Sequence, residues 1–113
     1  METTPSRLEQ LLAFYREDPA DPFTVYAIAT EYRSAGQPTQ AWPYYQELLE
    51  QHPGYVGTYY HAGKLQAEQG DAAQAEQILR KGLQVARQAG QLHAASELQQ
   101  ALNQVLGLDY EDD

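Results

Sequence analysis

The feature that most constrains the fold of this chain is a recurrence of residue types at one fixed offset. Identical residues lie 34 positions apart in four pairs, which are Pro19 and Pro53, Tyr26 and Tyr60, Gly36 and Gly70, and Ala41 and Ala75. Glycine ends a helix where a positive φ is needed, alanine lets two helices approach closely, and proline stops a helix. A period of this length, with two helices per unit, predicts stacked helix-turn-helix repeats.

Turn signals divide the chain into six segments that favour helix. They are DPADP (18–22), AGQP (35–38), HPGY (52–55), QGD (69–71) and AGQ (89–91). Ala, Leu, Gln and Glu dominate between these turns, and no stretch shows the alternation of a strand. Short connections make consecutive helices antiparallel. We expect helices at roughly 5–17, 22–35, 38–51, 56–69, 72–88 and 91–106.

Pro43 falls inside the helix expected at 38–51, where it removes one backbone hydrogen bond. Two alternatives are consistent with the sequence. The helix begins late, near Trp42, which places Pro43 in the first turn, or it is kinked at the proline. With a late start, Trp42 lies near the beginning of the helix and is partly exposed.

Composition bounds the class of protein. The 113 residues fit one domain, and the absence of cysteine excludes disulfides and zinc–thiolate sites. A net charge of -9, from 16 acidic and 7 basic residues, argues against a nucleic-acid partner. No apolar run approaches the ~20 residues of a membrane span, and the first residues lack a signal-peptide pattern. We therefore expect a cytoplasmic protein with neither a nucleic-acid nor a membrane partner.

The repeat resembles the tetratricopeptide repeat (TPR) family. At the signature positions, a first repeat at 22–55 has Val25, Ile28, Ala29, Tyr32, Gly36, Ala41, Tyr45 and Pro53, and a second at 56–89 has Tyr59, Ala62, Gly63, Gly70, Ala75 and Leu79. Residues 5–19 resemble the second half of a preceding repeat, and 91–106 resemble a terminal capping helix. The stretches DPFTVYAIATEY, YVGTYYHAGKL and GQLHAASELQQAL are similar to a group of small bacterial TPR proteins.

The resemblance implies an all-α fold, an alpha-alpha superhelix of about six antiparallel helices. It implies a single TPR domain over 1–108, followed by an acidic tail at 109–113. The second repeat departs from the pattern, since Gly82 replaces an alanine-like residue and Arg87 stands where proline is usual. We therefore expect the helix at 72–88 to continue into VARQAG before the chain turns.

The resemblance also indicates a binding face, because the first helix of each TPR repeat lines a concave groove for peptides. On the helix at 56–69, Tyr59 shares a packing face with Ala62, Gly63 and Gln66. The opposite face holds Tyr60, His61 and Lys64 together with Gly57 and Ala67. The groove residues implied on the two first helices are Phe23, Tyr26, Thr30, Arg33, Tyr60, His61 and Lys64. The last helix would add Gln91, Ala94, Ala95 and Leu98.

The chemistry of this groove suggests its ligand. Arg33 and Lys64 give it a weak positive charge, and Tyr26 and Tyr60 are amphipathic anchors one repeat apart. We expect a peptide or protein partner with an apolar anchor and an acidic or C-terminal carboxylate group. In the alternative interpretation, the two tyrosines pack between adjacent first helices and Lys64 is merely solvated.

Catalysis has little support in the sequence. No serine or cysteine lies one helical turn from His61, and no phosphate loop, dinucleotide fingerprint, HExxH or calcium loop is present. We expect no catalytic residue, no metal and no cofactor. The function that we expect is a non-catalytic protein–protein interaction module, an adaptor or scaffold.

A self-assembling structural module is the alternative function. It would form a homodimer through Trp42 and Tyr44 or through the C-terminal helix, so the chain is expected to be a monomer or a weak homodimer. The basic cluster Arg80, Lys81 and Arg87 has two interpretations: favourable charge near a helix C-terminus, or a docking patch for an acidic partner.

Overall fold

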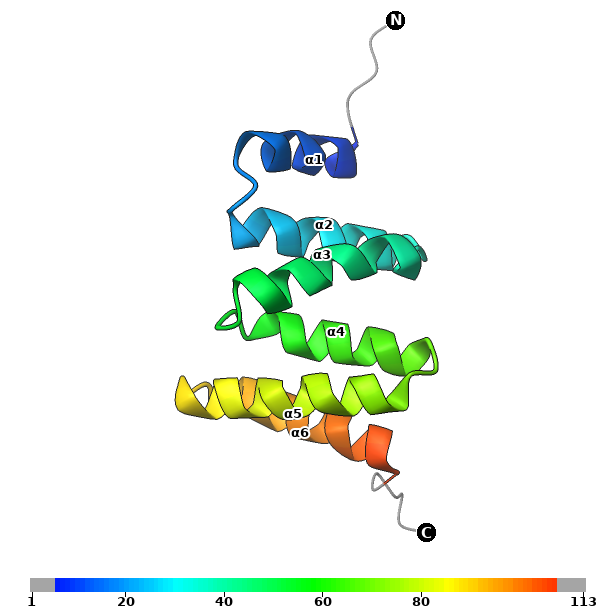
Figure 1. Ribbon diagram of the computed structural model, residues 1–113, viewed down its shortest axis with the longest axis vertical. Helices are drawn as coiled ribbons and strands as arrows, with labels where there is room; N and C mark the ends of the chain where they lie inside the picture. The colour runs from blue at the N-terminus through cyan, green and yellow to red at the C-terminus, as the bar shows by residue number, and fades with distance from the viewer. Residues whose placement is uncertain (1–5, 108–113) are drawn as a thin grey trace, which may run out of the picture. The chain divides into compact units, whose positions relative to one another are not determined.

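The computed structural model describes residues 6–107, and every regular element in that range is an α-helix (Figure 1). The six helices are α1 (Arg7–Glu17), α2 (Pro22–Ser34), α3 (Pro38–Gln51), α4 (Gly57–Glu68), α5 (Ala72–Gln88) and α6 (Leu92–Leu106). Each begins and ends within two residues of its predicted bounds, and the all-α fold of helix-turn-helix pairs is confirmed. The acidic tail expected at 109–113 lies outside the described residues.

The chain divides into two compact units, Met1–His52 and Pro53–Asp113. In the first unit α2 and α3 form an antiparallel pair around a fully buried core. Its members, Val25, Ile28, Ala29, Ala41, Tyr45 and Leu48, are each 0% exposed. The pair begins with the Asp21 N-cap, whose carboxylate accepts from the Phe23 N–H at 3.0 Å, and turns at Gly36 with φ 74°. The expected role of this glycine is confirmed.

Helix α1 packs against this pair through aromatic and polar contacts. The Tyr15 ring meets the Tyr44 ring edge-on at 5.8 Å, and its hydroxyl donates to Glu47 Oε1 at 2.8 Å. Tyr44 also stacks on Tyr32 at 5.9 Å. The bond to Glu47, together with burial, raises the pKa of Tyr15 to about 12. Tyr15 therefore links α1 to α3, and Tyr44 lies within the packing of the first unit.

The structure excludes one of the two alternatives for Pro43. Helix α3 starts at Pro38, so the late start near Trp42 is wrong. Pro38 takes the first helical position, where the missing N–H costs nothing, and Pro43 lies in the helix interior. Pro43 leaves the Thr39 carbonyl without its helical donor, but Thr39 is exposed and water can satisfy that oxygen.

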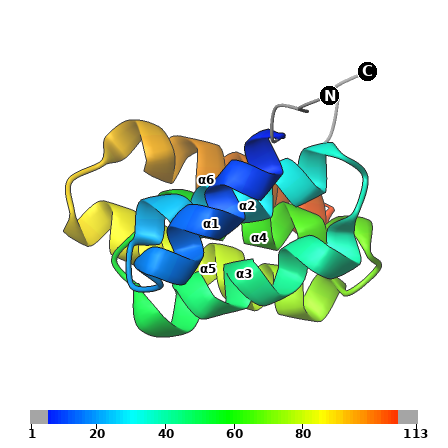
Figure 2. The ribbon, with the colours of Figure 1, turned by 90° about the horizontal axis from the view of Figure 1, so that it is seen from above.

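In the second unit α4 and α5 form an antiparallel pair, and α6 runs back alongside α5 after the turn at Gly90 (Figure 2). The Asp71 carboxylate caps α5 by accepting from the Gln74 N–H at 3.0 Å. Helix α5 has 17 residues against 14 in α3, which confirms the expected extension. Helix α6 contacts both α4 and α5, and buries Ala95, Leu98, Ala101 and Leu102.

Gly82 lets the helices of this unit approach closely. A Cβ on Gly82 would overlap the Tyr59 Cβ and would lie 2.9 Å from its Cγ and 3.1 Å from Leu98 Cδ2. Any side chain at this position of α5 would thus meet α4 and α6 together. The departure from the alanine-like residue of the repeat pattern therefore has a packing cause, which is the Tyr59 ring opposite.

Within residues 6–107, no helix is both long enough and apolar enough to cross a membrane.

Candidate functional site

The α2 face of the first unit presents the four predicted residues at graded exposure. Phe23 is 72% exposed, whereas Tyr26, Thr30 and Arg33 are half-buried. The Thr30 hydroxyl donates to the Tyr26 carbonyl at 2.9 Å. All four side chains lie within about 80° around the helix, so they form one surface.

Arg33 and Thr30 also lie near the hydroxyl of Tyr45, which is fully buried beneath this face. Burial raises the pKa of Tyr45, and the two neighbours oppose that rise. The Arg33 side chain is partly exposed on this face. A carboxylate approaching the α2 face would meet its positive charge.

The α4 face of the second unit brings Tyr60, His61 and Lys64 together. The Lys64 ammonium lies 5.3 Å from the centre of the Tyr60 ring and 3.5 Å from its hydroxyl oxygen. The His61 ring meets the Tyr60 ring edge-on at 5.4 Å. All three side chains are half-buried. The opposite face packs as predicted, since Tyr59, Ala62, Gly63 and Gln66 are buried.

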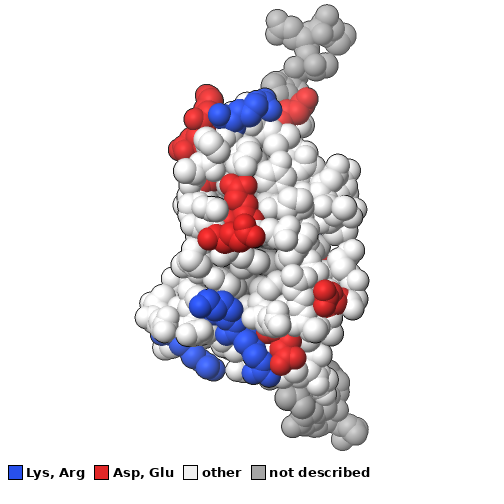
Figure 3. All heavy atoms as spheres, viewed as in Figure 1, with Lys and Arg blue, Asp and Glu red and all other residues white. Residues whose placement is uncertain are grey.

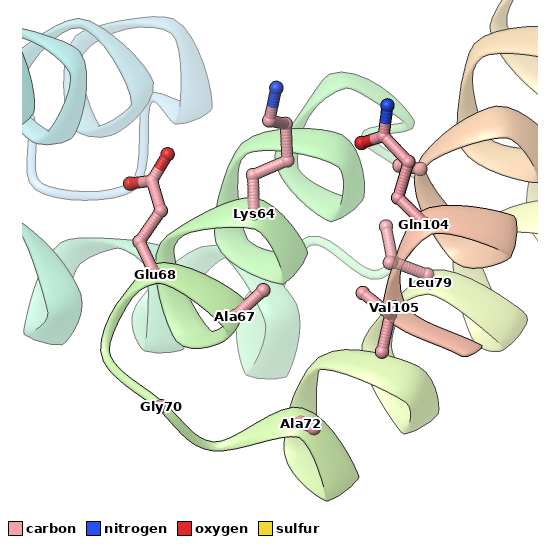
Figure 4. A pocket seen from close by; sticks show the side chains of 9 residues that line it. Lys64, Ala67, Glu68, Gly70, Ala72, Leu79, Gln104 and Val105 are labelled. Carbon is pink, nitrogen blue, oxygen red and sulfur yellow. The ribbon is translucent and has the colours of Figure 1, made fainter. Parts of the chain in front are cut away.

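A cavity of about 450 Å³ adjoins this face and extends toward α6. Its lining is Lys64, Ala67, Glu68, Gly70, Ala72, Leu79, Ala101, Gln104 and Val105. Lys64 and Gln104 project from α4 and α6, and Ala67 and Val105 face each other across the space (Figure 4). Aliphatic side chains surround the interior, and charged groups stand at Lys64 and Glu68. The site can therefore hold a small apolar group next to a cation.

Sequence reasoning missed the α6 part of this cavity and assigned other residues of α6 to the surface. Leu98 and Ala95 were expected on the groove, and that expectation is wrong because they are 1% and 8% exposed. Ala101, Gln104 and Val105 line the cavity instead. The signal that could have found them is the length of α5, which shifts α6 out of the 34-residue register.

Several polar residues outside these faces form local contacts. His93 Nε2 lies 3.5 Å from Glu97 Oε2, one helical turn away, and the backbone N–H of His52 donates to the Leu48 carbonyl at the C-terminal end of α3. Arg80 pairs with Glu76 at 2.8 Å. Over residues 6–107 no group of three His, Cys, Asp or Glu side chains is placed to hold a metal ion.

Comparison with known proteins identifies the family. The family model described as tetratricopeptide repeat matches residues 32–102. A crystal structure of a tetratricopeptide repeat domain protein from Salinibacter ruber is 41% identical, with a TM-score of 0.75, and the match covers 78% of this chain and 98% of that one. A solution structure of a tetratricopeptide repeat domain protein from the same organism is 40% identical over 85% of this chain and 97% of that chain, with a TM-score of 0.75.

A solution structure of a protein from Bordetella parapertussis is 25% identical, with a TM-score of 0.79, over 94% of this chain and 92% of that one. No curated protein matches the chain. The family match spans more than half of the chain, and the Salinibacter structure is similar along nearly its whole length. The chain therefore belongs to the tetratricopeptide repeat family.

Proposed function

We propose that the chain is a non-catalytic adaptor or scaffold that binds a peptide or a partner protein in the groove that the TPR family implies, with candidate contact residues on α2 and on α4. Repeats of this family generally mediate protein–protein interaction, and its members are generally non-catalytic. The proposed contact residues are Phe23, Tyr26, Thr30, Arg33, Tyr60, His61 and Lys64. The observation that carries the proposal is the Tyr60–Lys64 pair beside the apolar cavity.

The geometry of that pair supports a ligand with an apolar anchor and a carboxylate. The apolar side chain would enter between Ala67 and Val105, and the carboxylate would accept from the Lys64 ammonium. Glu68 stands at the same cavity, so a second acidic group placed there would be repelled. On the α2 face of the first unit, Arg33 offers a cation for an acidic residue or a C-terminal carboxylate. A small surface of this kind predicts modest affinity.

We also propose a class of partner, a location and a domain organisation for the protein. The partner is a protein or peptide rather than nucleic acid, because a net charge of -9 disfavours contact with phosphates. We place the protein in the cytoplasm, as a single domain over 1–108 with repeats at 22–55 and 56–89. No cofactor takes part in the proposed function.

The test is affinity capture from a lysate of the source organism, with proteins identified by mass spectrometry. Wild type is compared with Tyr60→Ala and Lys64→Ala, and with Lys81→Ala, which removes the same charge from an exposed site on α5. Circular dichroism checks that each variant folds. We expect a partner that wild type and Lys81→Ala capture and that both α4 variants lose. A partner that all four proteins retain would contradict the proposed site.

A peptide from the captured partner then tests the ligand chemistry. Its affinity is measured by calorimetry with the carboxylate free and with the same group converted to an amide. On wild type, the amide peptide should bind more weakly than the peptide with the free carboxylate. On Lys64→Ala, the two peptides should bind equally well, because the cation that contacts the carboxylate is gone. An equal loss in both proteins would place the carboxylate elsewhere.

A further inference from the structure

Among residues 6–107, each end of the helix series holds a helix that lacks its repeat partner. Helix α2 pairs with α3, and α4 pairs with α5. Helix α6 follows as a first helix, in contact with α5 and α4, and no described helix pairs with it as a second helix. Helix α1 has the position of a second helix, and no described helix precedes it.

Phe14 marks the missing partner on α1. Leu48 and Gly82 are the residues 34 and 68 positions later, at the same place in α3 and α5, and both are buried. Phe14 is 57% exposed. In the two complete repeats, therefore, this position is covered, and in α1 a large aromatic side chain occupies it without that cover. Phe14 is therefore a large apolar side chain that the described residues leave exposed.

Two adjoining hollows mark the corresponding gap on α6. One, of about 600 Å³, lies between α5 and α6 over Leu83, Leu102 and Leu106. The other, of about 500 Å³, lies along α6 over Leu92 and Ala95. Arg87, Gln99 and Asn103 line both hollows. Leu92 is 75% exposed and Leu106 is 36% exposed, so this side of α6 carries an exposed leucine at each end, with the polar side chains of Ser96, Gln99, Gln100 and Asn103 between them.

The residue sizes on the two surfaces match. The buried residues of α6 at 95, 98, 101 and 102 have the spacing of 59, 62, 65 and 66 on α4, so Ala95 stands where α4 has Tyr59. In the complete repeat the large Tyr59 meets the small Gly82. If α1 packed on α6, the large side chain would come from the second helix instead of the first, because Phe14 of α1 would face the small Ala95 of α6. A second helix carrying phenylalanine at this position fits α6.

The charges match as well. A second helix on α6 would run parallel to α5, because α5 and α6 are antiparallel, as are the two helices of each pair. The C-terminal end of α1 carries two exposed acids, Glu17 and Asp18, against one base, Arg16, and it would then lie beside the C-terminal end of α5, with Arg87. Basic side chains gather over α5 (Figure 3), and within the described range no acidic residue lines either hollow.

We propose that α1 of one copy docks on the α5–α6 surface of another copy and supplies the second helix of a repeat in trans. The interface joins two different surfaces, α1 on one molecule and α5–α6 on the next. Such a heterologous contact leaves a docking surface free at each end, so copies can add one after another instead of stopping at a dimer. The inference is independent of the proposed peptide-binding faces.

Two variants of the full chain test the proposal, each blocking one surface at an exposed residue. Phe14→Ser blocks the α1 surface, and Leu92→Glu blocks the α6 surface. Masses are followed by sedimentation over a wide concentration range. We expect wild type to grow beyond twice the monomer mass of 12.7 kDa, and each variant alone to remain monomeric. A mixture of the two should form a dimer and grow no further, because each retains the surface that the other lacks.

Phe23→Ser is the matched control, since Phe23 is also an exposed phenylalanine of the first unit, and it should assemble like wild type. Circular dichroism checks the fold of each variant. The proposal would be overturned if wild type were monomeric at every concentration. It would also be overturned if wild type formed a dimer that Phe14→Ser abolishes and Leu92→Glu leaves intact. A further outcome would also overturn the proposal, namely a wild type that associates only after residues 108–113 are removed. That result would mean that these residues occupy the α6 surface in the full chain.

Discussion

Replacing Gly82 by alanine should destabilise the second unit, although alanine is the better helix former. Alanine in a helix interior is favoured over glycine by about 1 kcal/mol. The added methyl group would overlap the Tyr59 Cβ, which is attached directly to the α4 backbone and cannot rotate away. Helix α4 or α5 must therefore move, and overpacking of this kind costs about 1–3 kcal/mol. Because Leu98 at 3.1 Å blocks movement toward α6, we expect a cost near the upper end and a net loss of about 1–2 kcal/mol.

Urea denaturation followed by circular dichroism measures this loss, and Gly63→Ala is the matched control. A Cβ on Gly63 would lie 2.5 Å from Leu79 Cδ2 and 2.6 Å from its Cγ, side-chain atoms that move with χ1, which the Cβ of Tyr59 does not. Gly63→Ala should therefore lose less stability than Gly82→Ala. A Gly82→Ala protein as stable as wild type would refute the account of the α4–α5–α6 contact given above.

Three further substitutions should change the free energy of unfolding in a direction that follows from the structure, and urea titrations measure each change. Asp71→Ala removes the N-cap of α5 and should cost about 1 kcal/mol, whereas Asp71→Ser should retain most of the stability. Pro43→Ala restores a hydrogen bond inside α3 at an exposed position, so it should raise stability by about 2 kcal/mol. Tyr15→Phe should lose up to about 1 kcal/mol at neutral pH, after allowance for solvent screening. The pKa of Tyr15 is raised in the folded state from 10.0 to about 12, so its contribution is present below pH 10 and the difference should shrink as the pH rises to 12.

Helix positions could be predicted from the sequence because the turn residues act locally. Gly36 and Gly70 adopt φ values of 74° and 90°, a conformation that L side chains rarely take, so their positions alone end α2 and α4. The face assignment of α4 rests equally on local geometry, since a rotation of 100° per residue separates Tyr59 from Tyr60. The structure agrees that Tyr59 is buried and Tyr60 only partly so.

The features that the sequence could not provide depend on contacts between helices. Pro43 inside a helix is unfavourable by itself, and α3 includes it because Ala41, Tyr45 and Leu48 on either side are fully buried against the first unit. Tertiary packing outweighs the local cost there. The cavity between α4 and α6 likewise depends on where α6 lies, and no local signal in Gln104 or Val105 indicates it.

The misplaced α6 face and the uncovered side of α6 have the same origin. A strict 34-residue step would bury the positions 93 and 96, but the buried positions are 95 and 98, two residues later. Two residues rotate a helix face by roughly 200°, which carries Leu98 from the expected groove into the core. The same shift places Ala95, a small residue, where Tyr59 stands in the preceding helix, so α6 fits a second helix with a larger side chain than Gly82. Because Phe14 of α1 is such a residue, one change of register accounts both for the error in the predicted groove and for the complementarity of α1 and α6.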